Sequence, residues 1–140
     1  MSYWWIPAII IVLLFVYSFY KKYTMLKNMD ASGSESPNVI TLNDSIYKNQ
    51  IKSGVTLIDF WAPWCMPCKV QGPIINEVAD EMVDKAAICK INIDDNKKAA
   101  AEFGIRSIPT ILIFKDGKIV KQLMGVKSKT VITKNLLAHL

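Results

Sequence analysis

Two cysteines separated by two residues, Cys65 and Cys68, come shortly after a strongly apolar run in the middle of the chain. The run, Val55 to Ala62, is nearly continuous in apolar and β-branched residues, which is typical of a strand buried on both faces of a mostly parallel sheet. From Lys69 to Val83 the apolar residues recur at helical spacing instead. The cysteine pair therefore lies where a buried strand gives way to a helix.

This position has a chemical consequence for Cys65. The first N–H groups of a helix have no partner within it and carry partial positive charge, so they favour a thiolate over a thiol. Cys68 lies one helical turn further on, close enough to form a disulfide with Cys65. We therefore expect thiol chemistry, with Cys65 as the attacking thiolate and Cys68 as the resolving thiol.

The residues around the pair form a set of motifs in a characteristic order. In chain order they are Asp59, Phe60-Trp61-Ala62, Trp64-Cys65-Met66-Pro67-Cys68-Lys69, Pro73, Lys90, Ile105 to Thr110, Gly117 and Gly125. Together they resemble the thioredoxin family over the region from Asn38 to Leu140. Met66 is a departure, because that family most often carries glycine at this position.

The order of predicted elements is β-α-β-α-β-α-β-β-α, parallel at first and antiparallel at the end, which predicts an α/β fold with a mixed central sheet and helices on both faces. The resemblance implies the same architecture, the thioredoxin fold. Asn43-Asp44-Ser45 and Asp94-Asp95-Asn96 are expected to cap the helices that follow them. The expected strands are 39–42, 55–62, 86–94, 110–115 and 118–124, and the expected helices are 46–53, 69–83, 97–103 and 129–140.

Asp59 is not explained by packing, because an ionised and unpaired acid in a buried strand costs several kcal/mol. Burial raises the pKa of such a carboxyl, which suits it to accept the proton of Cys68. The resemblance implies this role and brings Lys90 near enough to moderate it. The alternative is an acid at a strand end that reaches water.

A loop proline and its neighbours are the expected client-binding region. The resemblance implies that Pro109 is cis and packs beside the cysteines, where the Ile108 backbone pairs with an extended client chain. Gly125 either leaves room for that chain or only relieves a bend. The full set of expected substrate-binding residues is Trp64, Met66, Pro67, Ile108, Pro109 and Gly125.

Composition excludes several other classes of protein. The net charge of +5 is modest and forms no basic stripe, so nucleic-acid binding is not expected. Three cysteines and one histidine do not make a disulfide scaffold, and Cys89 and His139 lie outside any zinc-ligand spacing, so neither a metal nor another cofactor is expected. Cys89 is predicted to be a small buried side chain, with a regulatory thiol as the alternative.

The first residues of the chain have a different character. Tyr3 to Tyr20 contains no charged side chain and has aromatic residues at both ends, and as a helix it would span about 27 Å, close to the hydrocarbon thickness of a bilayer. We predict a single-pass transmembrane anchor at 1–22, bound to lipid through residues 3–20. A flexible tether at 23–37 and a thioredoxin domain at 38–140 are expected to follow. A cleavable signal peptide and a buried helix are the alternatives.

The positive charges that follow this segment bear on its orientation. Lys21, Lys22 and Lys27 all lie on its C-terminal side, which favours a domain that faces the cytoplasm; an extracytoplasmic domain is the alternative.

The residues and the resemblance to the thioredoxin family together predict a membrane-tethered protein-disulfide reductase. The expected partners are disulfide-containing client proteins and an electron donor, either a thioredoxin reductase or a membrane thiol-relay protein. A disulfide oxidase or isomerase, and a non-catalytic binding subunit that uses the same groove, are the alternatives.

Overall fold

The computed structural model describes residues 1–28 and 35–140, with side chains for 1–22 and 35–140. The chain divides into two units, Met1–Gly33 and Ser34–Leu140. The predicted tether at 23–37 therefore lies partly outside the described residues.

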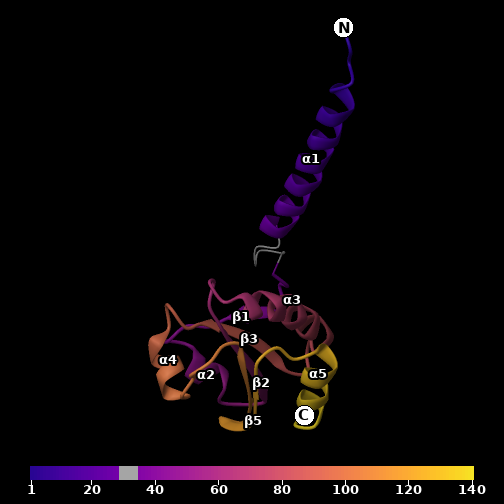
Figure 1. Cartoon of the computed structure of the whole chain (residues 1–140). Helices are drawn as coiled ribbons and strands as arrows, with labels where there is room; N and C mark the ends of the chain where they lie inside the picture. The colour runs from indigo at the N-terminus through magenta and orange to yellow at the C-terminus, as the bar shows by residue number, and fades with distance from the viewer. Residues whose placement is uncertain (29–34) are drawn as a thin grey trace. The chain divides into compact units, whose positions relative to one another are not determined.

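The first unit is dominated by one helix, α1 (Ile6–Asn28) (Figure 1). Its described side chains are all exposed, so that apolar groups surround the helix. The helix continues six residues beyond the predicted end of the anchor, through residues such as Lys, Met and Leu that form helices readily. Measured over the described part of the chain, no helix combines the length and the apolarity needed to cross a membrane.

The second unit is built on a five-stranded sheet. Its strands are β1 (Val39–Thr41), β2 (Val55–Trp61), β3 (Ala87–Asn92), β4 (Thr110–Lys115) and β5 (Lys118–Met124). They lie in the order β1-β3-β2-β4-β5, with β1, β3 and β2 parallel and the β2–β4 and β4–β5 pairs antiparallel. The predicted mixed sheet is thereby confirmed.

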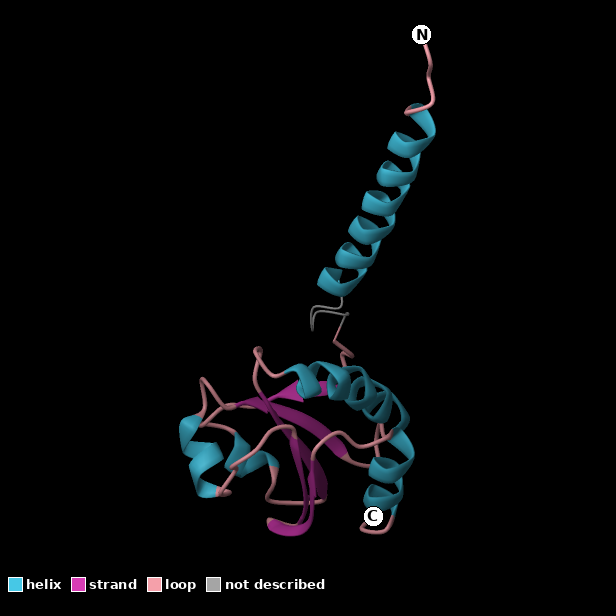
Figure 2. Cartoon of the chain, viewed as in Figure 1, coloured by secondary structure: helices cyan, strands magenta, loops and turns pink. Residues whose placement is uncertain are grey.

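Helices cover both faces of this sheet, as predicted (Figures 1 and 2). On one face lie α3 (Met66–Glu81) and α5 (Lys129–Leu137), and on the other lie α2 (Tyr47–Gln50) and α4 (Lys97–Glu102). Several bounds differ from the prediction: α5 ends three residues before the expected 140, and β3 covers Ala87–Asn92 rather than 86–94. α3 begins three residues earlier, at Met66, since Cys65 caps it, and α2 is a single turn rather than a helix over 46–53.

The alternation of side chains along β2 separates two apolar cores. Val55 and Leu57 pack against α3 and α5, whereas Ile58 and Phe60 pack towards α2 and α4. Asp59 follows the first pair at the same spacing, so it faces α3, the helix that begins with the cysteines.

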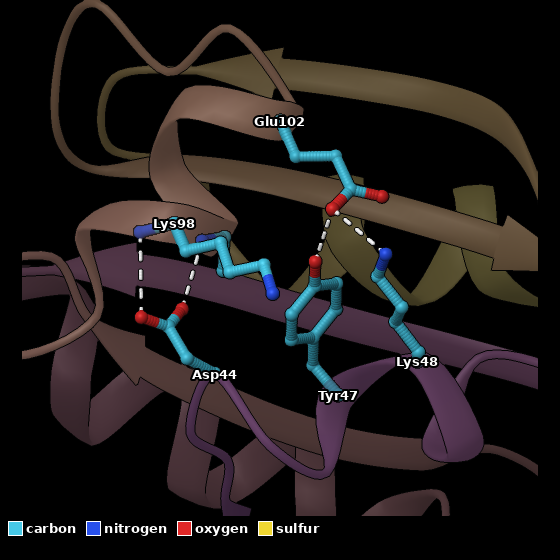
Figure 3. A network of polar contacts seen from close by, with 6 residues as sticks. Asp44, Tyr47, Lys48, Lys98 and Glu102 are labelled. Atoms are coloured by element: carbon cyan, nitrogen blue, oxygen red, sulfur yellow. Dashed lines mark hydrogen bonds and ion pairs between the residues drawn. The ribbon is translucent and has the colours of Figure 1, made fainter.

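The N-terminus of α4 is capped differently from the prediction. Asn96 occupies the N-cap position, but its side chain makes no capping hydrogen bond. The cap comes instead from Asp44, whose carboxylate accepts hydrogen bonds from the backbone N–H of Ala99 at 2.8 Å and of Lys98 at 3.3 Å (Figure 3). The Asn96 amide oxygen in turn accepts from the Asp44 N–H at 3.0 Å, so the two residues join α4 to the turn before α2.

A second contact joins the same two helices. The buried Tyr47 donates its hydroxyl hydrogen to Glu102, which also pairs with Lys48 at 3.3 Å (Figure 3). The ring of Phe103 packs edge-on against those of Tyr47, Phe60 and Phe114. α2 and α4 are thus held to each other and to the sheet by both polar and aromatic contacts.

We predict that Asp44→Ala lowers the free energy of unfolding by about 1 to 2 kcal/mol, because it leaves two N–H groups of α4 without their acceptor. Urea denaturation measures the change. Asp95→Ala is the matched control, since the exposed Asp95 belongs to the predicted cap but accepts a hydrogen bond from the Asn92 side-chain amide instead of from α4, and we expect an effect below about 0.5 kcal/mol. Equal losses in the two variants would contradict the role of Asp44.

Candidate active site

The cysteine pair lies at the junction between β2 and α3. Cys65 is the N-cap of α3, with extended backbone angles, and its Sγ accepts a hydrogen bond from the Cys68 N–H at 3.2 Å. Pro67 lies in the first turn, where its missing N–H removes no helical hydrogen bond. Cys65 and Cys68 form a disulfide with a Cα–Cα distance of 5.3 Å, and each is 4% exposed.

The loop that contains the proline lies beside the pair. The Ile108–Pro109 peptide bond is cis, as the resemblance implied, and the Ile108 carbonyl oxygen is 3.8 Å from Cys65 Sγ. Pro109 is buried, and the side chain of Ile108 packs against the cysteines. A backbone carbonyl therefore stands next to the sulfur of Cys65.

A third segment, around Gly125, joins this loop. The Gly125 N–H donates to the Pro109 carbonyl at 2.9 Å, and its φ of 75° is a conformation that favours glycine. An added Cβ would meet only the flexible Lys127 ammonium, at 3.9 Å. The backbone angle, rather than crowding within the protein, explains the glycine, and room for a client chain remains a prediction.

Gln71 of α3 holds the segment that follows Gly125, and the sequence reasoning missed it. Its side chain is fully buried; it accepts from the Lys127 N–H at 2.7 Å and donates to the Lys127 carbonyl at 3.2 Å. A signal was available, because Gln71 lies four residues before Ile75, on the apolar face of the helix. A polar residue on such a face needs buried partners.

Two of the expected client-binding side chains are exposed beside the pair. Trp64 is 66% exposed and Met66 is 68% exposed. The Trp64 indole N–H donates to the two carboxylate oxygens of Asp94 at 3.0 and 3.3 Å, a contact that the sequence reasoning missed because it assigned Asp94 to a helix cap. Both side chains present apolar surface next to the disulfide.

Asp59 is buried, with 3% of its surface exposed, which excludes the alternative of an acid that reaches water. Its Oδ1 has no hydrogen-bond partner among the described residues. Burial raises the pKa of Asp59 from 3.8 to about 7, against the opposing effect of the Lys90 charge. The upward shift of the Asp59 pKa agrees with the prediction, and a carboxyl with such a pKa gains and loses a proton near neutral pH.

Lys90 is paired with Asp59 in the register of β2 and β3. Its ammonium lies 2.6 Å from a carboxylate oxygen of Glu35 and 5.0 Å from the centroid of the Trp61 ring. The contact with Glu35 was not foreseen, because residues 35–37 were assigned to a flexible tether. Glu35 instead forms an ion pair with the domain.

The remaining cysteine and the described carboxylates offer no second site. Cys89 is fully buried in the apolar core, and burial raises its pKa to about 12, which matches the predicted small buried side chain. Within residues 1–22 and 35–140, no group of three or more His, Cys, Asp or Glu side chains could hold a metal ion.

The raised pKa of Asp59 predicts a pH-dependent stability. Its folded-state pKa, about 7, lies above the ordinary value of 3.8, so the stability that this group contributes falls as pH rises from about 4 to about 7. Asp59→Asn should therefore raise the free energy of unfolding of the oxidised protein by roughly 2 to 4 kcal/mol at pH 8.

At pH 4 the same substitution should have an effect below about 1 kcal/mol, because Asp59 is protonated in the folded state and still close to half protonated in the unfolded state there. Urea denaturation at the two pH values measures the difference, with Asp95→Asn as the exposed control. A constant effect of Asp59→Asn at both pH values would contradict the burial of an ionisable acid.

Comparison with known proteins agrees with this geometry. The family model described as thioredoxin matches residues 38–138. Thioredoxin of Bacillus subtilis (strain 168) is 40% identical over 102 residues, which cover 73% of this chain and 98% of that protein.

Two further relatives show the same pattern. Thioredoxin 2 of Chlorobaculum tepidum is 50% identical over 86 residues, 61% of this chain and 79% of that protein. Thioredoxin 1 of Synechococcus elongatus is 41% identical over 101 residues, 71% of this chain and 94% of that protein. With its Cys65–Cys68 pair at the start of α3, the chain belongs to the thioredoxin family and is a protein-disulfide reductase.

Proposed function

We propose that the chain reduces disulfides in client proteins at a membrane surface, with Cys65 as nucleophile, Cys68 as resolving thiol and Asp59 as proton acceptor. The observation that carries the catalytic part is the position of Cys65, whose sulfur accepts the N–H of Cys68 at the unpaired end of α3. An acceptor placed there is stabilised most when it is an anion.

The reaction runs in two displacements. In the reduced protein the Cys65 thiolate attacks one sulfur of a client disulfide, forms a mixed disulfide and releases the other client sulfur as a thiolate. Cys68 then loses its proton and attacks Cys65 Sγ, which releases the second client sulfur and leaves the Cys65–Cys68 disulfide. Two electrons pass to the client, and an external thiol donor of the reductase or relay class restores the pair.

Asp59 is the proposed acceptor of the Cys68 proton. It is buried on the face of the sheet that α3 covers, and its pKa of about 7 lets it take up and give back a proton near neutral pH. An ordinary surface carboxylate would be a weaker base, because its pKa is lower by about three units.

The client is proposed to bind as an extended chain across the Ile108–Pro109 loop. The Ile108 backbone beside Cys65 Sγ offers hydrogen bonds to such a chain, and the exposed Trp64 and Met66 offer apolar contacts. Pro67 and Gly125 flank the same area. Main-chain recognition of this kind suits a reductase that accepts many different clients.

The membrane part of the proposal is supported by the sequence of residues 3–20 and by the exposure of apolar side chains around α1. Lys21 and Lys22 favour a domain that faces the cytoplasm, where a thioredoxin reductase would be the donor. An extracytoplasmic domain would need a membrane thiol relay instead.

Single cysteine variants test the two-step chemistry. Cys65→Ser should lower the rate of insulin disulfide reduction by more than about a hundredfold, because it removes the nucleophile. Cys68→Ser should also lose turnover, but it should accumulate a mixed disulfide with insulin that is visible on a non-reducing gel. Cys89→Ser is the matched control and should keep normal turnover. A mixed disulfide that forms in Cys65→Ser would contradict the assignment.

Fractionation and thiol labelling test the membrane part. We expect the full chain to remain with membranes after carbonate extraction and a variant without residues 1–22 to be released. A membrane-impermeant maleimide should label reduced Cys65 in lysed cells but not in intact ones. Release of the full chain would contradict the anchor, and labelling in intact cells would contradict the cytoplasmic orientation.

A further inference from the structure

The segment that precedes β1 is fixed to the domain by polar contacts. The Glu35 carboxylate lies 2.6 Å from the Lys90 ammonium of β3. The largely buried Ser36 donates a hydrogen bond to Asp80 of α3, and the Asn38 side-chain amide donates to the same carboxylate at 2.9 Å. The segment is thus held at two points, one on the sheet and one on the helix.

Lys90 forms an ion pair with Glu35 and is the strand neighbour of Asp59. It is paired in register with Asp59, and only 22% of its side-chain surface is exposed. The Trp61 ring, two residues beyond Asp59 on the same face of β2, lies 5.0 Å from its ammonium. Trp61 and Glu35 together therefore fix the position of the one positive charge next to Asp59 on the paired strand.

We propose that Glu35 is a positioning residue for disulfide reduction: by pairing with Lys90 it weakens the positive field at Asp59 and so sets the pH at which Asp59 accepts the Cys68 proton. The inference rests on the proposed role of Asp59 as proton acceptor. The segment before β1, which contains Glu35, would then influence proton transfer in the active site.

Lys90 is the charged group that acts on the pKa of Asp59. Asp59 Oδ1 has no hydrogen-bond partner among the described residues, and Lys90 is the charge that opposes the effect of burial. The groups on the elements packed around Asp59 and Lys90 are Cys65 and Cys68 at the start of α3, Trp61 of β2, Ile111 of β4, Thr41 of β1, and Glu35.

Glu35→Gln tests the proposal, because glutamine keeps an oxygen that accepts from Lys90 but carries no charge. The pKa of Asp59 should fall by about half a unit, which lowers the ratio of protonated to ionised carboxyl about threefold at a given pH. The measurement is a carbon-detected NMR titration of the Asp59 carboxyl in the full chain in mild detergent, with Asp59→Asn to assign the signal. The acid limb of the pH profile for insulin reduction should shift by the same amount.

Two controls make the test specific. Glu81→Gln removes the same charge from an acid that lies 3.2 Å from Lys129, and it should leave the Asp59 titration unchanged. In a Lys90→Met background, Glu35→Gln should shift the titration by less than half as much as in the natural protein.

An unchanged or raised pKa in Glu35→Gln, an equal shift in Glu81→Gln, or a full shift without Lys90 would each overturn the proposal. A failure of the proton-acceptor role gives a different result. In that case the Asp59→Asn variant would reduce insulin at the normal rate at all pH values, whatever effect Glu35→Gln has on the titration of Asp59.

Discussion

The structure depends on one local constraint, the need to satisfy the N–H groups where α3 begins. The chain leaves β2 at Trp61 and enters α3 at Met66, and the residue between them that caps the helix is a cysteine. Serine, aspartate or asparagine would cap such an end as well as or better than sulfur. The choice of cysteine therefore makes sense only with Cys68 one turn away, where the same sulfur forms and breaks a disulfide.

Asp59 adds a second constraint, and here the needs of folding oppose those of the proposed proton acceptor. A carboxyl that is 3% exposed, with one oxygen unpartnered, reduces stability at neutral pH. The same burial raises its pKa to about 7, the range that the proposed role as proton acceptor requires. The surrounding sheet has apolar cores on both faces, and the charge of Lys90, which forms an ion pair with Glu35, opposes the effect of burial on Asp59.

The sequence predicted the parts of the site that lie close together along the chain or in a recognisable motif. The strand before the cysteines, the helix after them and the buried acid all follow from short-range patterns, and the cis bond before Pro109 followed from the resemblance. Contacts made across long separations were missed, such as Asp44 on α4 and Gln71 on the segment after Gly125. In the sequence these side chains resemble ordinary loop or helix residues, because their backbone partners lie more than fifty residues away along the chain.

The central claim is that the start of α3 holds the Cys65 sulfur as an anion in the reduced protein. The most direct test is the pH dependence of alkylation of Cys65 by iodoacetamide, measured by mass spectrometry of the modified peptide. If the sulfur is held as an anion, alkylation remains fast at pH 7 and reaches half its maximal rate at or below about pH 7.5. Half-maximal alkylation near pH 8.5, as for an ordinary exposed thiol, would contradict it.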